Sequence, residues 1–154
     1  FYVWTQRDVA LALHNTLDGN AVPLREALFA NCIITGSKSD EIMGYLSDFG
    51  DTIAGGASYR FVSSLLNTKA ADENENFVNI VWDDKDNPPF GKEHFWLIDN
   101  SIYKYDFHID SLSTARGIAS KEYSSLFPAG LSGVQRPAEN ADAGCFQFVS
   151  IVDK

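Results

Sequence analysis

The stretch Ile102–Asp110 reads IYKYDFHID, and from Tyr103 onward apolar and titratable residues alternate. Successive side chains of a β-strand point to opposite faces of the sheet. The stretch therefore predicts a strand with one aromatic face and one titratable face. The aromatic face consists of Tyr103, Tyr105, Phe107 and Ile109, and the titratable face consists of Lys104, Asp106, His108 and Asp110. A shift or bulge of one residue would exchange the face that points into the protein.

A partner strand is predicted just upstream, over Lys92–Ile98, and the intervening Asp99-Asn100 pair is typical of a hairpin turn. A two-residue turn places Trp96 opposite Tyr103 and puts His94 on the aromatic face. A bulged turn puts His94 on the titratable face instead. The residues themselves leave both pairings open.

The first third of the chain has apolar residues at helical spacing behind candidate N-caps. We expect helices within Thr5–Gly19, Pro23–Leu28 and Ser37–Gly50. Runs rich in β-branched and aromatic residues predict further strands. These runs are Cys32–Thr35, Ser58–Lys69 and Phe77–Asp84.

The tail after Asp110 differs in composition from the rest. Ser120–Phe127 predicts a short helix, the following segment is rich in Pro and Gly, and Cys145–Val152 has strand composition. No internal repeat is recognised. The order of elements predicts an α+β fold, with a curved antiparallel sheet wrapped around N-terminal helices as a cone or roll. We expect a domain over residues 1–110 and a C-terminal extension over residues 111–154.

Composition excludes several classes of protein. The chain has 154 residues, is 45% hydrophobic and carries a formal net charge of −9. This charge argues against nucleic acid and anionic membrane surfaces as partners, and no apolar run is long enough to span a bilayer. Cys32 and Cys145 are too few for a disulfide framework, and the dispersed histidines lack the spacing of a metal site. The compartment is not identified, although a cytoplasmic one is favoured.

Three stretches resemble the SnoaL-like group of the nuclear transport factor 2-like superfamily. They are Leu28–Ile33 (LFANCI), Gly36–Leu46 (GSKSDEIMGYL) and Asp99–Asp110 (DNSIYKYDFHID). The resemblance implies a cone-shaped fold with a pocket at its open end. It also implies acid–base chemistry on small hydrophobic molecules, such as polyketide- or terpenoid-like substrates, without a cofactor. Cyclases, dehydratases and isomerases occur in the group, as do proteins without catalysis, so the fold does not settle the function.

The candidate catalytic residues are His94, Asp106 and His108. In the epoxide-hydrolase branch, the catalytic carboxylate lies where this chain has Phe107, so that mechanism is not expected here. His94 could exchange a proton near neutral pH if it faces the pocket. Asp106 and His108 could act as an acid–base pair if the titratable face points inward. Alternatively, His94 is a structural histidine and the pair faces water.

Aromatic residues on the predicted helix stripe and strands could bind the substrate. The candidates are Tyr45, Phe49, Trp82, Trp96, Tyr103, Tyr105 and Phe107. Several of them could equally belong to the hydrophobic core. Two hypotheses therefore remain. One is an enzyme of the cyclase, dehydratase or isomerase type. The other is a non-catalytic module that binds a hydrophobic ligand or serves as a scaffold, and we expect a homodimer.

Overall fold

Short strands that pair in parallel make up most of the fold. The computed structural model describes residues 9–45, 57–69 and 75–150. In those residues, three ladders run parallel throughout. The first ladder pairs β1 (Leu11–His14) with β6 (Ile42–Tyr45). The second consists of β4 (Leu24–Ala30), β7 (Ala57–Val62) and β9 (Phe77–Val78). The third consists of β5 (Ile33–Ile34), β8 (Leu65–Leu66) and β10 (Val81–Trp82).

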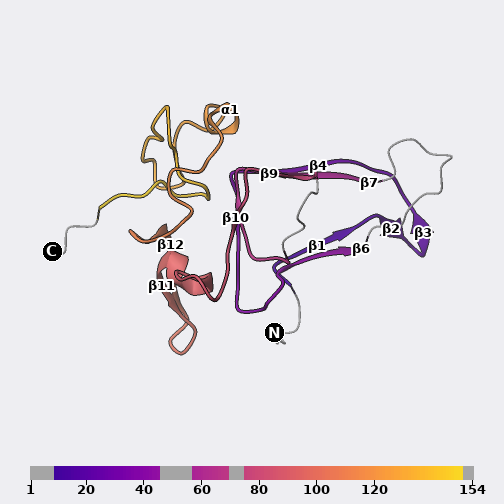
Figure 1. Cartoon of the computed structure of the whole chain (residues 1–154), viewed down its shortest axis with the longest axis horizontal. Coiled ribbons are helices and arrows are strands. Elements are labelled where there is room, and N and C mark those ends of the chain that lie inside the picture. Colours follow the sequence, from indigo (N-terminus) through magenta and orange to yellow (C-terminus); the bar gives the residue numbers. More distant parts are fainter. Residues whose placement is uncertain (1–8, 46–56, 70–74, 151–154) are drawn as a thin grey trace.

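The ladders form the sides of a coil. Figure 1 shows β4, β7 and β9 along one side, β1 and β6 along another, and β10 between them. The chain passes from β4 to β5, returns through β6, and then passes from β7 to β8 and from β9 to β10. Each turn thus lies on the previous one in parallel register. This arrangement is a parallel β-solenoid, in which each turn packs mainly on its neighbours.

The predicted α+β cone is wrong. No helix occurs in the described residues before Gly91, and the antiparallel pairing described there consists of two short hairpins and the isolated bridge between Ala129 and Gln135. The segments Thr5–Gly19, Pro23–Leu28 and Ser37–Gly50, which were expected to be helices, contain strands wherever they are described. Residues 5–8 and 46–50 lie outside the described residues. Pairing between strands about 30 residues apart leaves no local signal in the sequence, so short apolar runs fit a helix equally well.

A seven-residue unit recurs in the three turns, although the sequence alone did not reveal a repeat. It reads FANCIIT at Phe29–Thr35, FVSSLLN at Phe61–Asn67 and FVNIVWD at Phe77–Asp83. The third residue of every unit has a positive φ, of 55° at Asn31, 48° at Ser63 and 53° at Asn79. A left-handed residue turns the chain sharply. Each expected long strand is therefore two strands that meet at a corner.

The first residue of the unit forms an aromatic stack along the coil. The ring centroid of Phe61 lies 4.9 Å from that of Phe29 and 5.2 Å from that of Phe77. These distances match the spacing of neighbouring strands, because identical positions of parallel strands lie directly above one another. Phe61 is fully buried. Phe77 also contacts Trp82, with ring centroids 5.5 Å apart. Ile34 of β5 and Leu66 of β8 are aligned with Trp82 of β10, so this row of side chains faces the same interior.

A small antiparallel hairpin projects from the first turn. It joins β2 (Thr16–Leu17) to β3 (Asn20–Ala21) through Asp18 and Gly19, whose φ angles are 50° and 77°. Positive φ at both central residues is the signature of a type I′ turn, for which Asp-Gly is a preferred pair. The Asp-Gly pair was taken as the end of a helix, but it marks a hairpin.

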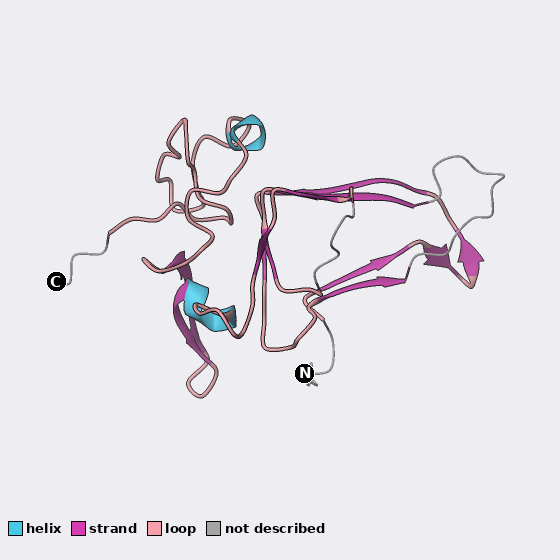
Figure 2. Ribbon diagram, viewed as in Figure 1, coloured by secondary structure: helices cyan, strands magenta, loops and turns pink. Residues whose placement is uncertain are grey.

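The C-terminal segment lies beside β10, outside the coil (Figure 2). It comprises the 3₁₀ helix η1 (Gly91–His94), β11 (Phe95–Asp99), β12 (Lys104–Ile109) and the helix α1 (Lys121–Ser124), followed by irregular chain. The predicted hairpin and the short helix within Ser120–Phe127 are confirmed. The strand expected at Cys145–Val152 is absent from its described residues, Cys145–Ser150.

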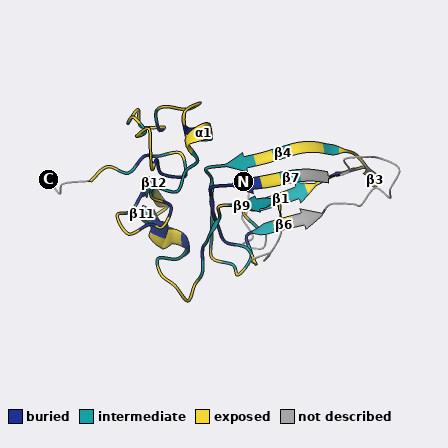
Figure 3. Ribbon diagram, turned by 45° about the horizontal axis from the view of Figure 1, so that its top comes forward, coloured by how far each residue is buried: buried dark blue, intermediate teal, exposed yellow. Residues whose placement is uncertain are grey.

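Small side chains of this segment pack on the outer face of the β5–β8–β10 ladder. Leu65 forms a buried cluster with Ala115 and Ala143, and Ile33 and Val81 pack against it. The ladder is therefore covered on both sides, by the aromatic interior and by the C-terminal segment. Figure 3 shows that the buried residues concentrate at this junction, whereas much of β4 is exposed.

Hydrogen bonds rather than regular structure hold the last part of the chain. Arg136 donates to the carbonyls of Asp142 (2.8 Å) and Gly144 (2.7 Å). The buried carboxylate of Asp142 accepts from the amides of Gly117 (2.8 Å) and Phe148 (2.7 Å). Polar groups that are buried need such partners, which explains how an irregular segment can pack against the coil.

We predict that Phe61→Ala lowers the free energy of unfolding by about 3–5 kcal/mol, because it leaves a cavity in the middle of the aromatic stack. The exposed Phe127 provides a matched control, and Phe127→Ala should change the stability by less than about 0.5 kcal/mol. Urea denaturation followed by far-ultraviolet circular dichroism measures both. Equal midpoints for the two variants would show that the stack does not stabilise the coil.

Candidate functional site

His94 is the last residue of η1 and is completely buried. Its Nε2 lies 2.9 Å from Asp83 Oδ1, and its Nδ1 lies 3.1 Å from Ser113 Oγ. Both ring nitrogens are thus engaged. His94 does not line the pocket described below. The geometry favours a role in holding the fold rather than in proton transfer to a substrate.

Asp83 connects this histidine to the coil. Its second oxygen, Oδ2, accepts hydrogen bonds from the Thr35 hydroxyl and from the Gly91 amide, the latter at 3.1 Å. We call Thr35, Asp83, His94 and Ser113 the histidine clamp. Thr35 and Asp83 are the seventh residues of the first and third repeat units, and His94 and Ser113 belong to the C-terminal segment. The clamp therefore ties two turns of the coil to that segment.

Serine, histidine and aspartate in hydrogen-bonded order are also the residues of a nucleophilic triad. Here, however, the Ser113 hydroxyl is buried and accepts the Ala115 amide at 3.2 Å. A nucleophile must be reachable by its substrate, and none of the clamp's Asp83, His94 and Ser113 lines the pocket beside the hairpin. The clamp is a structural network by these criteria.

The β11–β12 hairpin differs from both predicted turns. Asp99 pairs with Lys104, so the connection has four residues, Asn100–Tyr103. The pairing of Trp96 with Tyr103 is therefore wrong. A bulge between Phe95 and Leu97 then brings Phe95 opposite Ile109. Tyr103 has a positive φ of 54° and belongs to the turn rather than to the strand.

The aromatic face of this hairpin is largely open to solvent. Tyr103 is 82% exposed, and Trp96, Tyr105 and Phe107 are about half exposed. Tyr105 stacks on Phe107 with ring centroids 6.3 Å apart. Among these four predicted ligand-binding residues, Phe107 alone lines the hairpin pocket.

The remaining predicted ligand-binding residues lie elsewhere. Trp82 belongs to β10 and packs against Phe77 in the coil interior. Tyr45 ends β6, where its backbone pairs with His14, but its side chain is not among the described ones. Phe49 lies outside the described residues.

Asp106 and His108 form the predicted pair on β12. His108 Nδ1 lies 2.6 Å from Asp106 Oδ1, and the same oxygen accepts the His108 amide at 3.0 Å. Both side chains are more than one third exposed. The His108 ring stacks on Phe146, with centroids 4.1 Å apart. The structure thus brings these two residues together at the surface, and neither of them lines the hairpin pocket described below.

Hydrogen bonds from His108 lower the pKa of the Asp106 carboxyl below its ordinary value of 3.8. The larger contribution is the backbone amide of His108, and its imidazole adds to it. Both donors stabilise the ionised carboxylate, whereas partial desolvation opposes them weakly. The carboxylate is therefore held in its charged form beside the imidazole.

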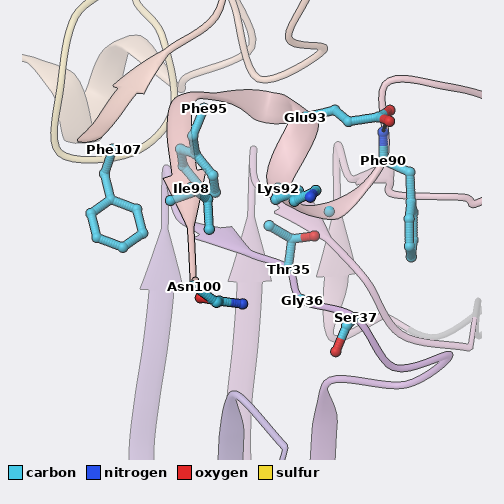
Figure 4. Close-up of a pocket in the computed structure, with 11 residues that line it drawn as sticks. Thr35, Gly36, Ser37, Phe90, Lys92, Glu93, Phe95, Ile98, Asn100 and Phe107 are labelled. Atoms are coloured by element: carbon cyan, nitrogen blue, oxygen red, sulfur yellow. Dashed lines mark hydrogen bonds between the residues drawn. The ribbon is translucent and has the colours of Figure 1, made fainter. Parts of the chain in front are cut away.

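A pocket of about 440 Å³ lies between the hairpin and the end of the first turn (Figure 4). We call it the hairpin pocket. Its apolar lining consists of Phe90, Phe95, Ile98 and Phe107, and its polar lining includes Thr35, Ser37, Lys92, Glu93 and Asn100. Figure 4 shows Phe90 and Phe107 on opposite sides of it. A hydrogen bond of 3.1 Å from the Phe90 amide to Glu93 Oε2 fixes the loop that carries Phe90.

Sequence reasoning missed several residues of the clamp and the pocket. Phe90 follows two prolines between the strands predicted at Phe77–Asp84 and Lys92–Ile98, and an aromatic residue in this connection was the available signal. Asp83 was assigned to a strand end, and Ser113 gave no signal. Hydrogen bonds between residues separated by irregular chain have no sequence pattern to reveal them.

Neither a metal centre nor a membrane-crossing helix is found in the part of the chain that the structure describes. No three His, Cys, Asp or Glu side chains gather there as a metal site. No helix in the same residues has the length and apolar character to cross a bilayer.

Comparison with known proteins gives no assignment. No family model, no curated protein and no solved structure matches the chain. The chain is therefore defined by its own geometry: a parallel β-solenoid with a C-terminal segment clamped to its side.

We predict that His94→Ala lowers the free energy of unfolding by about 3 kcal/mol, because it leaves Asp83 and Ser113 buried without their shared partner. His108→Ala is the matched control and should cost less than about 1 kcal/mol, since its ion pair is exposed. Urea denaturation monitored by tryptophan fluorescence compares them. If the control were as destabilising as His94→Ala, the clamp would not be the main tie.

The lowered pKa of Asp106 predicts how the stability of the protein depends on pH. A carboxyl whose pKa is lowered by folding contributes stability above its unfolded pKa, and this contribution is lost as the pH falls through the folded value. Between pH 6 and pH 2, Asp106→Asn should therefore lose less stability than the parent protein. Urea midpoints across this range measure the effect, and Asp86→Asn controls for the removal of one exposed negative charge. Parallel curves for parent and Asp106→Asn would contradict the prediction.

Proposed function

We propose that the chain is a non-catalytic binding module whose hairpin pocket takes a small apolar molecule. The observation that carries the proposal is the pocket itself. Its volume of about 440 Å³ falls in the range of small-molecule sites, and three phenylalanines and an isoleucine contribute to its lining. Residues from two parts of the fold form its wall, so the clamped C-terminal segment completes the site.

The polar residues of the pocket suit orientation of a guest rather than chemistry. Asn100 can donate and accept hydrogen bonds, and Lys92 and Glu93 contribute opposite charges. No histidine lines the hairpin pocket among the residues that are described. None of the three predicted catalytic residues lines the pocket, since His94 is buried in the clamp and the Asp106–His108 pair is on the surface.

The positions of the three predicted catalytic residues support ligand binding over acid–base catalysis. General acids and bases must come within hydrogen-bond reach of the reacting group. The Asp106–His108 pair has the chemistry of such a group, but neither residue lines the hairpin pocket. The earlier hypothesis of a cyclase, dehydratase or isomerase thus receives no support from the pocket.

The test uses N-phenyl-1-naphthylamine, a neutral apolar fluorophore, because a neutral probe avoids repulsion by the chain's net charge of −9. We expect saturable binding by the parent protein. Phe90→Ala and Ile98→Ala each remove apolar lining and should weaken binding about tenfold, which corresponds to about 1.4 kcal/mol. The Phe90 amide keeps its hydrogen bond to Glu93 in this variant.

Tyr103→Ala is the control, because Tyr103 is an exposed aromatic residue of the same hairpin that does not line the pocket. Its dissociation constant should remain within twofold of the parent value. Absence of saturable binding, or equal weakening by all three substitutions, would reject the hairpin pocket as the binding site. Circular dichroism confirms that each variant is folded.

A further inference from the structure

Both cysteines of the chain line one groove, and both are free thiols in the structure. Cys32 is the fourth residue of the first repeat unit, and Cys145 belongs to the C-terminal segment. The groove has a volume of about 570 Å³, and we call it the cysteine groove. Residues far apart in the sequence therefore bring their thiols to the same hollow of the surface.

A backbone hydrogen bond joins the two stretches of chain that carry the cysteines. The Gly144 amide donates to the Asn31 carbonyl at 2.7 Å, and these residues directly precede Cys145 and Cys32. Ile33 also lies against Gly144, where an added Cβ would come within 2.8 Å of the Ile33 Cδ1. Consecutive Cα atoms are only about 3.8 Å apart. Each cysteine is thus one residue away from a direct backbone contact between the two stretches.

The Cys32 thiol points away from the second turn of the coil. The equivalent residue of the second repeat unit is Ser64, whose hydroxyl accepts the Cys32 amide at 3.0 Å and donates to the Val62 carbonyl at 2.9 Å. The Cys32 thiol makes the same kind of contact with the Ala30 carbonyl, at 3.4 Å. The Ser64 side chain thus reaches toward the first turn, and the Cys32 side chain by the same geometry reaches into the cysteine groove.

The two thiols differ in accessibility. Cys145 is exposed, whereas Cys32 is partly buried. Burial raises the pKa of the Cys32 thiol, because desolvation disfavours the charged thiolate. The thiolate is the form that attacks a disulfide. An external disulfide should therefore react first with Cys145, and Cys32 should react second, from within the same molecule.

We propose that Cys32 and Cys145 form a reversible disulfide that ties the C-terminal segment to the first repeat unit. The oxidant is a low-molecular-weight disulfide such as oxidised glutathione. The Cys145 thiolate attacks one of its sulfurs, forms a mixed disulfide and releases one glutathione. The Cys32 thiolate then attacks the Cys145 sulfur and releases the second glutathione. The protein thiols thereby lose two hydrogens and two electrons, and the oxidant is reduced to two thiols.

This disulfide would add a covalent tie to the hydrogen bonds of the histidine clamp. The clamp holds the beginning of the C-terminal segment, whereas Cys145 lies near its end. A bond between residues 32 and 145 closes a long loop and so restricts the unfolded chain. The redox state of the thiols thereby sets how firmly the segment is attached. The proposal does not depend on ligand binding in the hairpin pocket, because neither cysteine lines it.

Oxidised glutathione at about pH 8.5, where thiolates are populated, tests the full chain. We expect a monomer whose mass falls by two hydrogens and whose digest contains a peptide pair linked through Cys32 and Cys145. Dithiothreitol should reverse the change. Cys32→Ser should stop at a glutathione adduct on Cys145, because the second thiol is missing, and Ser64 shows that a hydroxyl fits this position. Cys145→Ser should be modified at least tenfold more slowly.

A glutathione adduct that persists in the parent protein as it does in Cys32→Ser would overturn the proposal, because it would show that the two sulfurs do not meet. Disulfide-linked dimers would overturn it too, since the thiols would then pair between molecules. None of these results depends on the fluorophore experiment on the hairpin pocket.

A redox titration shows whether the fold itself brings the thiols together. In buffers of reduced and oxidised glutathione, the disulfide should form at least tenfold more favourably in the native chain than in concentrated urea. The control is Cys145→Ser with Ser101→Cys, because Ser101 is exposed at the tip of the hairpin and does not line the groove. This pair should show no native preference. The same equilibrium constant for Cys32 and Cys145 in native buffer and in urea would contradict their placement.

Discussion

The parallel register of the three repeat units is the constraint on which the rest of the structure depends. Phe61 stacks between Phe29 and Phe77 because the same position of each unit lies directly above its counterpart. A left-handed residue two positions later turns every unit at the same point. A slip of one residue would place an aromatic ring outside the coil and misalign the corners, since side chains alternate along a strand. The register of the strands and the position of the corners together therefore select a single stacking of the turns.

The histidine clamp applies that constraint to the rest of the chain. Thr35 and Asp83 occupy equivalent positions in the first and third units, so their closeness exists only when the turns are in register. His94 and Ser113 then attach the C-terminal segment to Asp83. Buried polar groups are costly unless all are satisfied. The clamp therefore favours one position of the C-terminal segment on the outer ladder.

The hairpin pocket is a consequence of this attachment. One wall comes from the end of the first repeat unit and the other from η1 and the hairpin. The same attachment leaves the tyrosines of the β11–β12 hairpin exposed, because the aromatic face of this hairpin lies at the edge of the pocket rather than inside a cone. A β-solenoid packs its core within each turn and between turns, so sites form where a second segment lies against the stack.

The sequence by itself determined the local features of the chain. Alternation in β12 predicted a strand and hence the closeness of Asp106 and His108, because residues two apart on a strand share a face. The short helix at α1 and the hairpin before it also follow from local patterns. Leu11 and Leu13 alternate with more exposed neighbours, so the strand period was present in β1 as well, although helical spacing was preferred there.

Only the tertiary structure decided the parallel pairing, the burial of His94 and the pocket. The partners of β1 and β4 lie about 30 residues further along the chain, and a single strand carries no mark of the strand that will lie beside it. Asp83, His94 and Ser113 are joined across irregular segments whose course depends on packing. Local patterns are set by backbone geometry over a few residues, whereas these contacts are set by how whole turns stack, which is a property of the complete fold.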